Sequence, residues 1–216
     1  MGNNTEMLPF FKKDTIEIGM DESGRGPMIG NVFAAAVIWD SKLTKEIDPF
    51  VAKIRDSKKV SKKQRPLIRD YIEKNAIDFA VCFADNNEID THNIMQATFM
   101  AMHRCLDKIN TKFDFIIVDG NTFKPYFDLK SQNYIPHECI VEGDNKYIAI
   151  AAASILAKVY HDEYITNLCK DNADMQLDTK YNLLNCMGYG TKKHFEGIKT
   201  YGITQFHRKS FLKKIF

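Results

Sequence analysis

The chain has 216 residues, of which 44% are hydrophobic and 27% charged, and its 30 Lys and Arg against 28 Asp and Glu give a net charge of +2. This composition excludes a collagen-like chain, a low-complexity disordered chain and a small protein stapled by disulfides. The length predicts a single domain, residues 1–216, with a core from about residue 14 to about residue 211.

The apolar segments and the cysteines indicate where such a chain works. The longest apolar runs, residues 32–39 and 148–153, are far shorter than the roughly 20 residues that cross a bilayer, so we expect no membrane association. The first residues contain no apolar core of signal-peptide length. Five scattered cysteines form no Cys-x-x-Cys pair, which is typical of a reduced protein without a zinc ribbon. We expect a cytoplasmic protein.

Periodicity and turn residues predict strands that alternate with helices. In chain order the predicted elements are strands at 16–20 and 32–39, a helix at 61–73 with Ser61 as its N-cap, a strand at 77–84, a helix at 93–109, strands at 113–118 and 134–141, a helix from 145 to about 168, a polar irregular segment at 170–187, a short helix at 192–200 and a basic tail. This order predicts an α/β fold.

Basic residues gather in three runs, whereas acidic residues are dispersed. The runs occupy residues 58–69, 192–194 and 207–214. Together they are typical of a protein that binds a polyanion with its bases and a metal with isolated acids. Taken singly, each run is more typical of a solvated helix face.

Three acidic sites each follow a predicted strand and lie beside glycine: Asp21-Glu22, Asp119 before Gly120, and Asp144 after Gly143. Strand ends in open α/β sheets gather at one edge, so these carboxylates are expected to converge there. Carboxylates that share a cleft raise one another's pKa unless cations neutralise them. Mg²⁺ prefers carboxylate oxygens, and two such ions can catalyse phosphoryl displacement.

Asp21 and Glu22 are neighbours in a predicted strand, and neighbouring residues in a strand point to opposite faces. Both can reach one site only if the chain leaves the strand between them, and Gly24 and Gly26 permit that turn. The same glycines leave backbone N–H groups open to a phosphate or sugar.

Each feature also has a purely structural interpretation. Alone, Asp119 before glycine is typical of a turn, Asp144 is a good helix N-cap, and His207 is typical of a core or surface histidine. Only the combination indicates a site.

Taken together, seven ordered segments resemble the ribonuclease HII family. The matching stretches are 18–27 (Ile-Gly-Met-Asp-Glu-Ser-Gly-Arg-Gly-Pro), 56–61 (Asp-Ser-Lys-Lys-Val-Ser), 118–121 (Val-Asp-Gly-Asn), 143–144 (Gly-Asp), 150–159 (Ile-Ala-Ala-Ala-Ser-Ile-Leu-Ala-Lys-Val), 188–194 (Gly-Tyr-Gly-Thr-Lys-Lys-His) and 207–211 (His-Arg-Lys-Ser-Phe).

The resemblance implies a ribonuclease H-like fold, with a mixed central β-sheet flanked by helices and a helical C-terminal part. It implies an endonuclease that hydrolyses the RNA strand of RNA–DNA hybrids and cuts 5′ of single ribonucleotides embedded in duplex DNA. Such an enzyme uses two Mg²⁺ or Mn²⁺ ions, leaves 3′-hydroxyl and 5′-phosphate ends, and serves ribonucleotide removal and primer or hybrid clearance. It also implies a monomer.

The resemblance further implies roles for single residues. The catalytic, metal-binding carboxylates would be Asp21, Glu22, Asp119 and Asp144. Gly24, Arg25 and Gly26 would contact the 2′-hydroxyl through the backbone, and Tyr189 would stack on the sugar of the next deoxynucleotide. Phosphate-side contacts would come from Lys58, Ser154, Lys158 and Arg208, the last within the 207–209 stretch.

Some positions depart from the family pattern. Ser23 replaces the common Ala, His161 replaces the common Arg and weakens a phosphate role there, and the 170–187 segment is longer than usual, which affects how Tyr189 is presented. Two other functions remain open: a nuclease of the sister family ribonuclease HIII, and a non-catalytic module that binds RNA–DNA hybrids. Clustered negative charge facing phosphate argues against the second.

Overall fold

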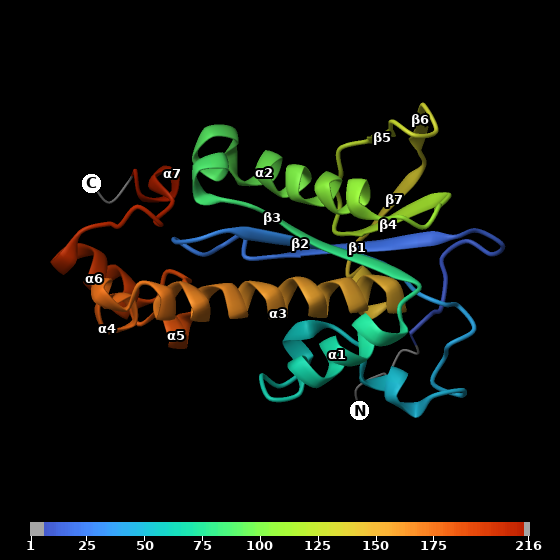
Figure 1. Ribbon diagram of the computed structural model, residues 1–216, viewed down its shortest axis with the longest axis horizontal. Helices are drawn as coiled ribbons and strands as arrows, with labels where there is room; N and C mark the ends of the chain where they lie inside the picture. Colours follow the sequence, from blue (N-terminus) through green and yellow to red (C-terminus); the bar gives the residue numbers. More distant parts are fainter. Residues whose placement is uncertain (1–6, 214–216) are drawn as a thin grey trace.

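A five-stranded mixed sheet forms the centre of the computed structural model, which describes residues 7–213 (Figure 1). The strands lie in the order β3-β2-β1-β4-β7, with β1, β2 and β3 antiparallel and β1, β4 and β7 parallel. Their bounds are β1 Glu17–Ser23, β2 Val32–Ile38, β3 Asp78–Ala84, β4 Phe115–Asp119 and β7 His137–Ile140. A separate hairpin pairs β5 (Tyr126–Asp128) with β6 (Asn133–Ile135).

Helices cover both faces of this sheet (Figure 1). α2 (Asn86–Lys108) lies on one face, whereas α3 (Ile148–Asp171) lies on the other together with α1 (Arg65–Asn75). A helical C-terminal part follows at one end of α3, made of α4 (Leu177–Tyr181), α5 (Leu183–Cys186), α6 (Lys192–Tyr201) and α7 (Lys209–Leu212). Short 3₁₀ helices occupy Pro49–Lys53, Ser57–Lys59, Gly143–Asn145 and Ala173–Met175.

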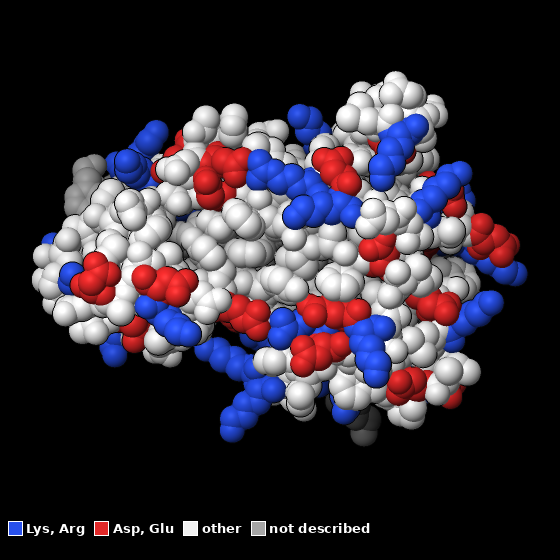
Figure 2. All heavy atoms as spheres, in the orientation of Figure 1, with Lys and Arg blue, Asp and Glu red and all other residues white. Residues whose placement is uncertain are grey.

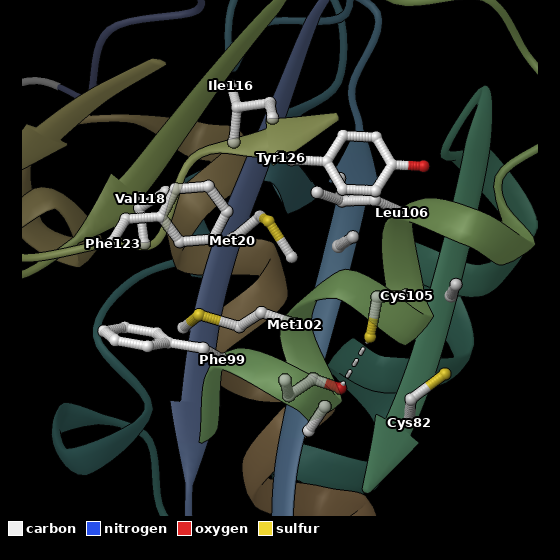
Figure 3. Close-up of a cluster of buried hydrophobic side chains, with 14 of the residues drawn as sticks. Met20, Cys82, Phe99, Met102, Cys105, Leu106, Ile116, Val118, Phe123 and Tyr126 are labelled. Carbon is white, nitrogen blue, oxygen red and sulfur yellow. Dashed lines mark hydrogen bonds between the residues drawn. The ribbon is translucent and has the colours of Figure 1, made fainter. Parts of the chain in front are cut away.

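Alternation along the strands divides the core into two layers. In β2, Val32, Ala34 and Ala36 pack on the α2 side, whereas Ala35 and Val37 pack on the α3 side. A central strand buried on both faces reads as a continuous apolar run, which explains the pattern at residues 32–39. Figure 3 shows the α2-side layer, where strand side chains such as Met20 and Val118 meet Phe99 and Met102 of the helix.

One glycine sets how closely β1 approaches α3. A Cβ placed on Gly19 would lie 2.4 Å from the carbonyl carbon of Ala149 and 2.6 Å from the amide nitrogen of Ile150. Both atoms belong to helix backbone, which cannot rotate away. The absence of a side chain at Gly19 therefore lets the first turn of α3 rest directly on the strand.

The predicted α/β fold with a mixed sheet and a helical C-terminal part is confirmed, but several boundaries differ. α1 begins at Arg65 rather than near Ser61, and the Ser61 cap prediction is wrong because Gln64 is the N-cap. α2 begins seven residues before the predicted start at 93. Asp85 and Glu88 form a capping box there, and the chain kinks at Asn93 (φ 68°).

Two predicted segments were also divided differently. The predicted strand at 134–141 is interrupted at Pro136 and becomes β6 and β7. The segment at 170–187, expected to be irregular, contains α4 and α5, whose Leu177, Tyr181 and Leu183 are buried in a third cluster with Ile29. Among residues 7–213, the helices lack the combination of length and apolarity needed to span a membrane.

The close packing of β1 on α3 gives a stability prediction. We expect Gly19→Ala to lower the free energy of unfolding by about 2–3 kcal/mol, because the added methyl group must push the backbone of α3 away. Urea denaturation followed by circular dichroism measures this. Gly143→Ala is the matched control: its Cβ would meet mainly the Cδ1 atom of Ile150 at 2.7 Å, the end of a side chain that can rotate, so the loss should stay below about 1 kcal/mol. Equal losses in the two variants would contradict the backbone argument.

Candidate active site

The strand register places two of the predicted carboxylates next to each other. β1 and β4 are parallel, with Met20 opposite Val118, so the next residues, Asp21 and Asp119, end the pairing side by side. Alternation turns both toward α3, because Gly19 contacts α3 and Ile117 packs in the α3-side layer. The ends of β1 and β4 therefore bring Asp21 and Asp119 together, as expected.

Asp144 joins them from the 3₁₀ turn between β7 and α3. The Gly143 N–H donates a 2.7 Å hydrogen bond to Asp119 Oδ1, which ties this turn to the end of β4. Oxygen atoms of Asp21, Asp119 and Asp144 lie within 4.8 Å of one another. Tyr147, not Asp144, is the N-cap residue of α3, so the alternative of Asp144 as the cap of that helix is wrong.

Glu22 lies apart from this group of three. The chain does not leave the strand between Asp21 and Glu22, because β1 continues to Ser23 and pairs with β2 from Gly19 to Ser23. The Glu22 side chain therefore leaves the strand in the opposite direction from that of Asp21, and its carboxylate forms a 3.2 Å ion pair with Arg25 at the edge of the group. It remains close enough for its charge to raise the pKa of Asp21.

Burial and mutual repulsion disfavour the charged forms of these acids. Asp21 is only 6% exposed, and burial, then the charges of Glu22 and Asp119, raise its pKa well above the usual value. Burial and the neighbouring Asp119 and Asp56 raise the pKa of Asp144 to about 6. Burial also raises the pKa of Glu22, against the opposing effect of Arg25.

This donor set fits hard divalent cations. Carboxylate oxygens are the ligands that Mg²⁺ and Mn²⁺ take in proteins, and a bound cation offsets both the burial and the mutual repulsion that raise the pKa values. Asp21, Asp119 and Asp144 could hold one ion together, and Glu22 lies at the edge of the group to extend it.

Asp56 is a neighbour that sequence reasoning did not single out. It caps the turn at Ser57–Lys59, where its Oδ1 accepts a 2.9 Å hydrogen bond from the Lys58 N–H, and it also contacts Asp144 through a side-chain hydrogen bond. The sequence feature that could have identified Asp56 as a site residue is its position at the start of the 56–61 motif. Lys58 is exposed and its positive charge opposes the raised pKa values of Glu22 and Asp144.

Ser154 lies in the floor of the site. It is buried, its Oγ lies 3.0 Å from Ser57 Oγ, and a hydrogen bond with Asp21 partly offsets the raised pKa of that carboxyl. This location suits holding Asp21 in place, whereas contact with a phosphate would need an exposed hydroxyl.

Beside the carboxylates, a glycine loop faces an aromatic side chain. Gly24 has φ +89° and leaves no room for a Cβ, which would lie 2.4 Å from Cδ2 of His161. A Cβ on Gly26 would lie 3.2 Å from Cε1 of Tyr189, so the ring packs directly against the loop. Tyr189 is 40% exposed and Arg25 is also exposed. The longer 170–187 segment thus still presents Tyr189 at this loop.

Lys158 lies near the same ring. Its Nζ is 5.9 Å from the centroid of Tyr189 and 2.7 Å from Asp162 Oδ1. His161, where the family commonly has Arg, is buried, and its Nδ1–H donates a 3.1 Å hydrogen bond to Asp162. Among residues 7–213, His161 Nε2 has no hydrogen-bond partner.

Arg208 is not where a phosphate contact requires it. The side chain is 0% exposed, and its guanidinium donates hydrogen bonds to four backbone carbonyls in and after the glycine loop. This burial contradicts the prediction that Arg208 contacts a phosphate. Residue 214 of the third basic run lies outside the described residues. Basic and acidic side chains are intermingled on the face drawn in Figure 2, without a single basic patch there.

Comparison with known proteins agrees with this geometry. The sequence model of the family described as Ribonuclease HII matches residues 18–214. Ribonuclease HII of Parabacteroides distasonis is 43% identical over 205 residues, which cover 95% of this chain and 94% of the relative. Ribonuclease HII of Christiangramia forsetii is likewise 43% identical, with the same coverage. These matches favour ribonuclease HII over the sister family.

A solved structure supports the fold. The crystal structure of ribonuclease H2 from Pyrococcus horikoshii OT3 superposes with a TM-score of 0.70 at 24% identity, covering 90% of this chain and 92% of that one. The family match over residues 18–214, the 43% identity and the acidic group together show that the chain belongs to the ribonuclease HII family, whose members are metal-dependent endonucleases acting on RNA–DNA hybrids.

Proposed function

We propose that this chain hydrolyses the phosphodiester bond on the 5′ side of a ribonucleotide, both within RNA–DNA hybrids and at single ribonucleotides in duplex DNA. Two divalent ions would be held by Asp21, Glu22, Asp119 and Asp144, and the products would carry 3′-hydroxyl and 5′-phosphate ends. The observation that carries this proposal is the group of three carboxylates with oxygens within 4.8 Å of one another.

The chemistry follows from the charges of these groups. A pair of ions held by these residues would supply Lewis acidity and would lower the pKa of a water molecule. The chain's own contribution is to hold the carboxylates in register at the ends of β1 and β4 and to bring Asp144 up through the Gly143–Asp119 bond. Ser154 and Asp56 would orient Asp21 and Asp144.

Recognition of the ribonucleotide is assigned to the loop at Gly24, Arg25 and Gly26 and to Tyr189. The 2′-hydroxyl is the group on the sugar that distinguishes RNA from DNA, and a backbone without Cβ atoms can approach it closely. Tyr189 lies against Gly26 with an exposed ring that can stack on the neighbouring sugar. Lys58 and Lys158 would meet phosphates, which fixes the duplex without reading its sequence.

The setting of this activity is also part of the proposal. Either Mg²⁺ or Mn²⁺ would serve, because both take carboxylate and water oxygens. A single domain acting as a monomer in the cytoplasm would suffice, since one chain supplies both the carboxylates and the loop. The five cysteines are free.

A cleavage assay on duplex DNA with one ribonucleotide tests the reaction. We expect a single metal-dependent cut 5′ of the ribonucleotide, absent when a chelator is added. Asp119→Asn should reduce kcat by at least roughly 100-fold, because it removes a charged ligand at the centre of the group. Binding of a hybrid, measured by fluorescence anisotropy, should persist. Asp174→Asn, which neutralises an exposed carboxylate in the C-terminal part, is the control and should cut normally.

Full activity of Asp119→Asn would contradict the assignment of two metal ions to these carboxylates. Hybrid binding without cleavage by the wild type, under either metal, would instead indicate a binding module.

Metal affinity should depend on pH through Asp144. Its pKa is raised to about 6, so below that pH the metal must displace a proton, and affinity should fall as the pH decreases. Calorimetric titration with Mn²⁺ between about pH 5 and about pH 7.5 should show up to roughly tenfold weaker binding per pH unit below the pKa. Asp144→Asn should bind more weakly and with less of this pH dependence. The same slope in both proteins would exclude Asp144 as its source.

A further inference from the structure

The glycine loop continues into a short strand that two distant segments enclose. Residue 27 pairs with residue 189 on one side, and residue 29 pairs with residue 207 on the other. The Met28 N–H donates to Gly188 O at 2.8 Å, whereas Met28 O accepts from the Arg208 N–H at 2.8 Å. These isolated bridges thus fix the loop and Tyr189 to the same backbone segment.

Arg208 determines which way the peptide groups of the loop point. Its guanidinium donates to Gly24 O (2.7 Å), Arg25 O (3.0 Å), Gly30 O (2.8 Å) and Asn31 O (3.0 Å). In a trans peptide, the carbonyl of one residue and the N–H of the next point in opposite directions. With the carbonyls of Gly24 and Arg25 turned inward, the N–H groups of Arg25 and Gly26 are turned away from Arg208. Within residues 7–213 neither N–H donates to another protein group.

His207, the preceding residue, acts on Tyr189 through a second histidine. The Thr204 N–H donates to His207 Nδ1 at 2.9 Å, which leaves the His207 proton on Nε2. That Nε2–H faces Nε2 of His194 at 3.3 Å, and the His194 Nδ1–H donates to Tyr189 O at 3.0 Å. Each ring thus has one donor and one acceptor, the pattern of two neutral imidazoles. Burial lowers the pKa of His194 and lowers that of His207 to about 3, which keeps both rings neutral.

We propose that His207 and Arg208 are positioning residues that together shape the ribose-binding site between the glycine loop and Tyr189. Arg208 orients the N–H groups of Arg25 and Gly26 toward the 2′-hydroxyl. His207, acting through His194, holds the backbone of Tyr189 so that its ring packs beside Gly26 and contacts the sugar. This inference rests on the proposed function, because it assumes that the loop and Tyr189 bind the sugar. It assigns a role to the 207–209 stretch that differs from the phosphate contact expected from the sequence.

The ratio of two cleavage rates tests the histidine part. The readout is kcat/KM on duplex DNA with one ribonucleotide divided by kcat/KM on a long RNA–DNA hybrid, because general loss of structure lowers both rates alike. We expect His207→Leu to lower this ratio at least tenfold, and we expect the same of Tyr189→Ala. His207→Gln carries an amide N–H near the position of Nε2, keeps the bond to His194 and should restore most of the ratio.

Two variants of His194 test the same hydrogen bonds in case His207→Leu does not fold. His194→Asn retains an N–H near the position of Nδ1 for the Tyr189 carbonyl but loses the partner of His207, so its ratio should fall below that of the wild type and stay above that of His194→Leu. A ratio in His194→Asn as low as in His194→Leu would overturn the role of this hydrogen bond.

Arg208→Lys tests the other part. Lys retains the positive charge but cannot span four carbonyls, so kcat/KM should fall at least tenfold on both substrates while the affinity for Mn²⁺ is unchanged. Cleavage at the wild-type rate would overturn the assignment of Arg208.

The outcomes separate this inference from the function beneath it. If the wild type and Tyr189→Ala show the same ratio, Tyr189 does not sense the junction, and the proposed recognition fails together with the inference. If Tyr189→Ala lowers the ratio but His207→Leu leaves it at the wild-type value, the proposed recognition stands and the histidine part of the inference is wrong.

Discussion

Repulsion among buried carboxylates is the constraint on which the rest of this structure depends. Asp21, Asp119 and Asp144 are held together in a poorly solvated place, and the pKa values of Asp21 and Asp144 are raised first by burial and then by the neighbouring charges, so that holding them there costs free energy. The scaffold offsets this cost through the parallel register of β1 and β4 and through the close packing of α3 against Gly19. A divalent cation relieves the repulsion, so the protein is built for a partner with positive charge.

Much of the fold could be predicted because the relevant signals are local. The apolar run at 32–39 and the helical spacing after Asn93 both follow from burial of a strand or of one helix face. Boundaries were less accessible. The capping box at Asp85 precedes the apolar periodicity, and the helices at 170–187 are held by a few buried side chains, such as Leu177, within a polar segment. Tertiary packing decides both cases, and a single sequence does not display it.

The site divides along the same line. Asp21, Asp119 and Asp144 could be predicted to converge because strand ends share an edge of the sheet. The orientation of Glu22 could not, because it depends on whether β1 continues for two more residues. Arg208 is the clearest failure: in the sequence it belongs to a basic run, yet its partners are carbonyls near residue 24, and only the folded chain brings them together. A charge in a motif therefore says less about its role than its burial does.

The bond from Arg208 to Gly24 joins residues 184 positions apart in the chain. Loop-closure entropy grows only slowly with separation, but this contact also needs the C-terminal part that carries Arg208 to be in place against the glycine loop. The carboxylates, in contrast, lie on β1, β4 and the turn before α3, within the central sheet and its first packed helix. Folding is therefore expected to assemble the metal-binding group before the glycine loop acquires its final shape. An incompletely folded chain would then hold ions without yet discriminating between sugars, so selectivity would be the last property that the molecule gains and the first that it loses.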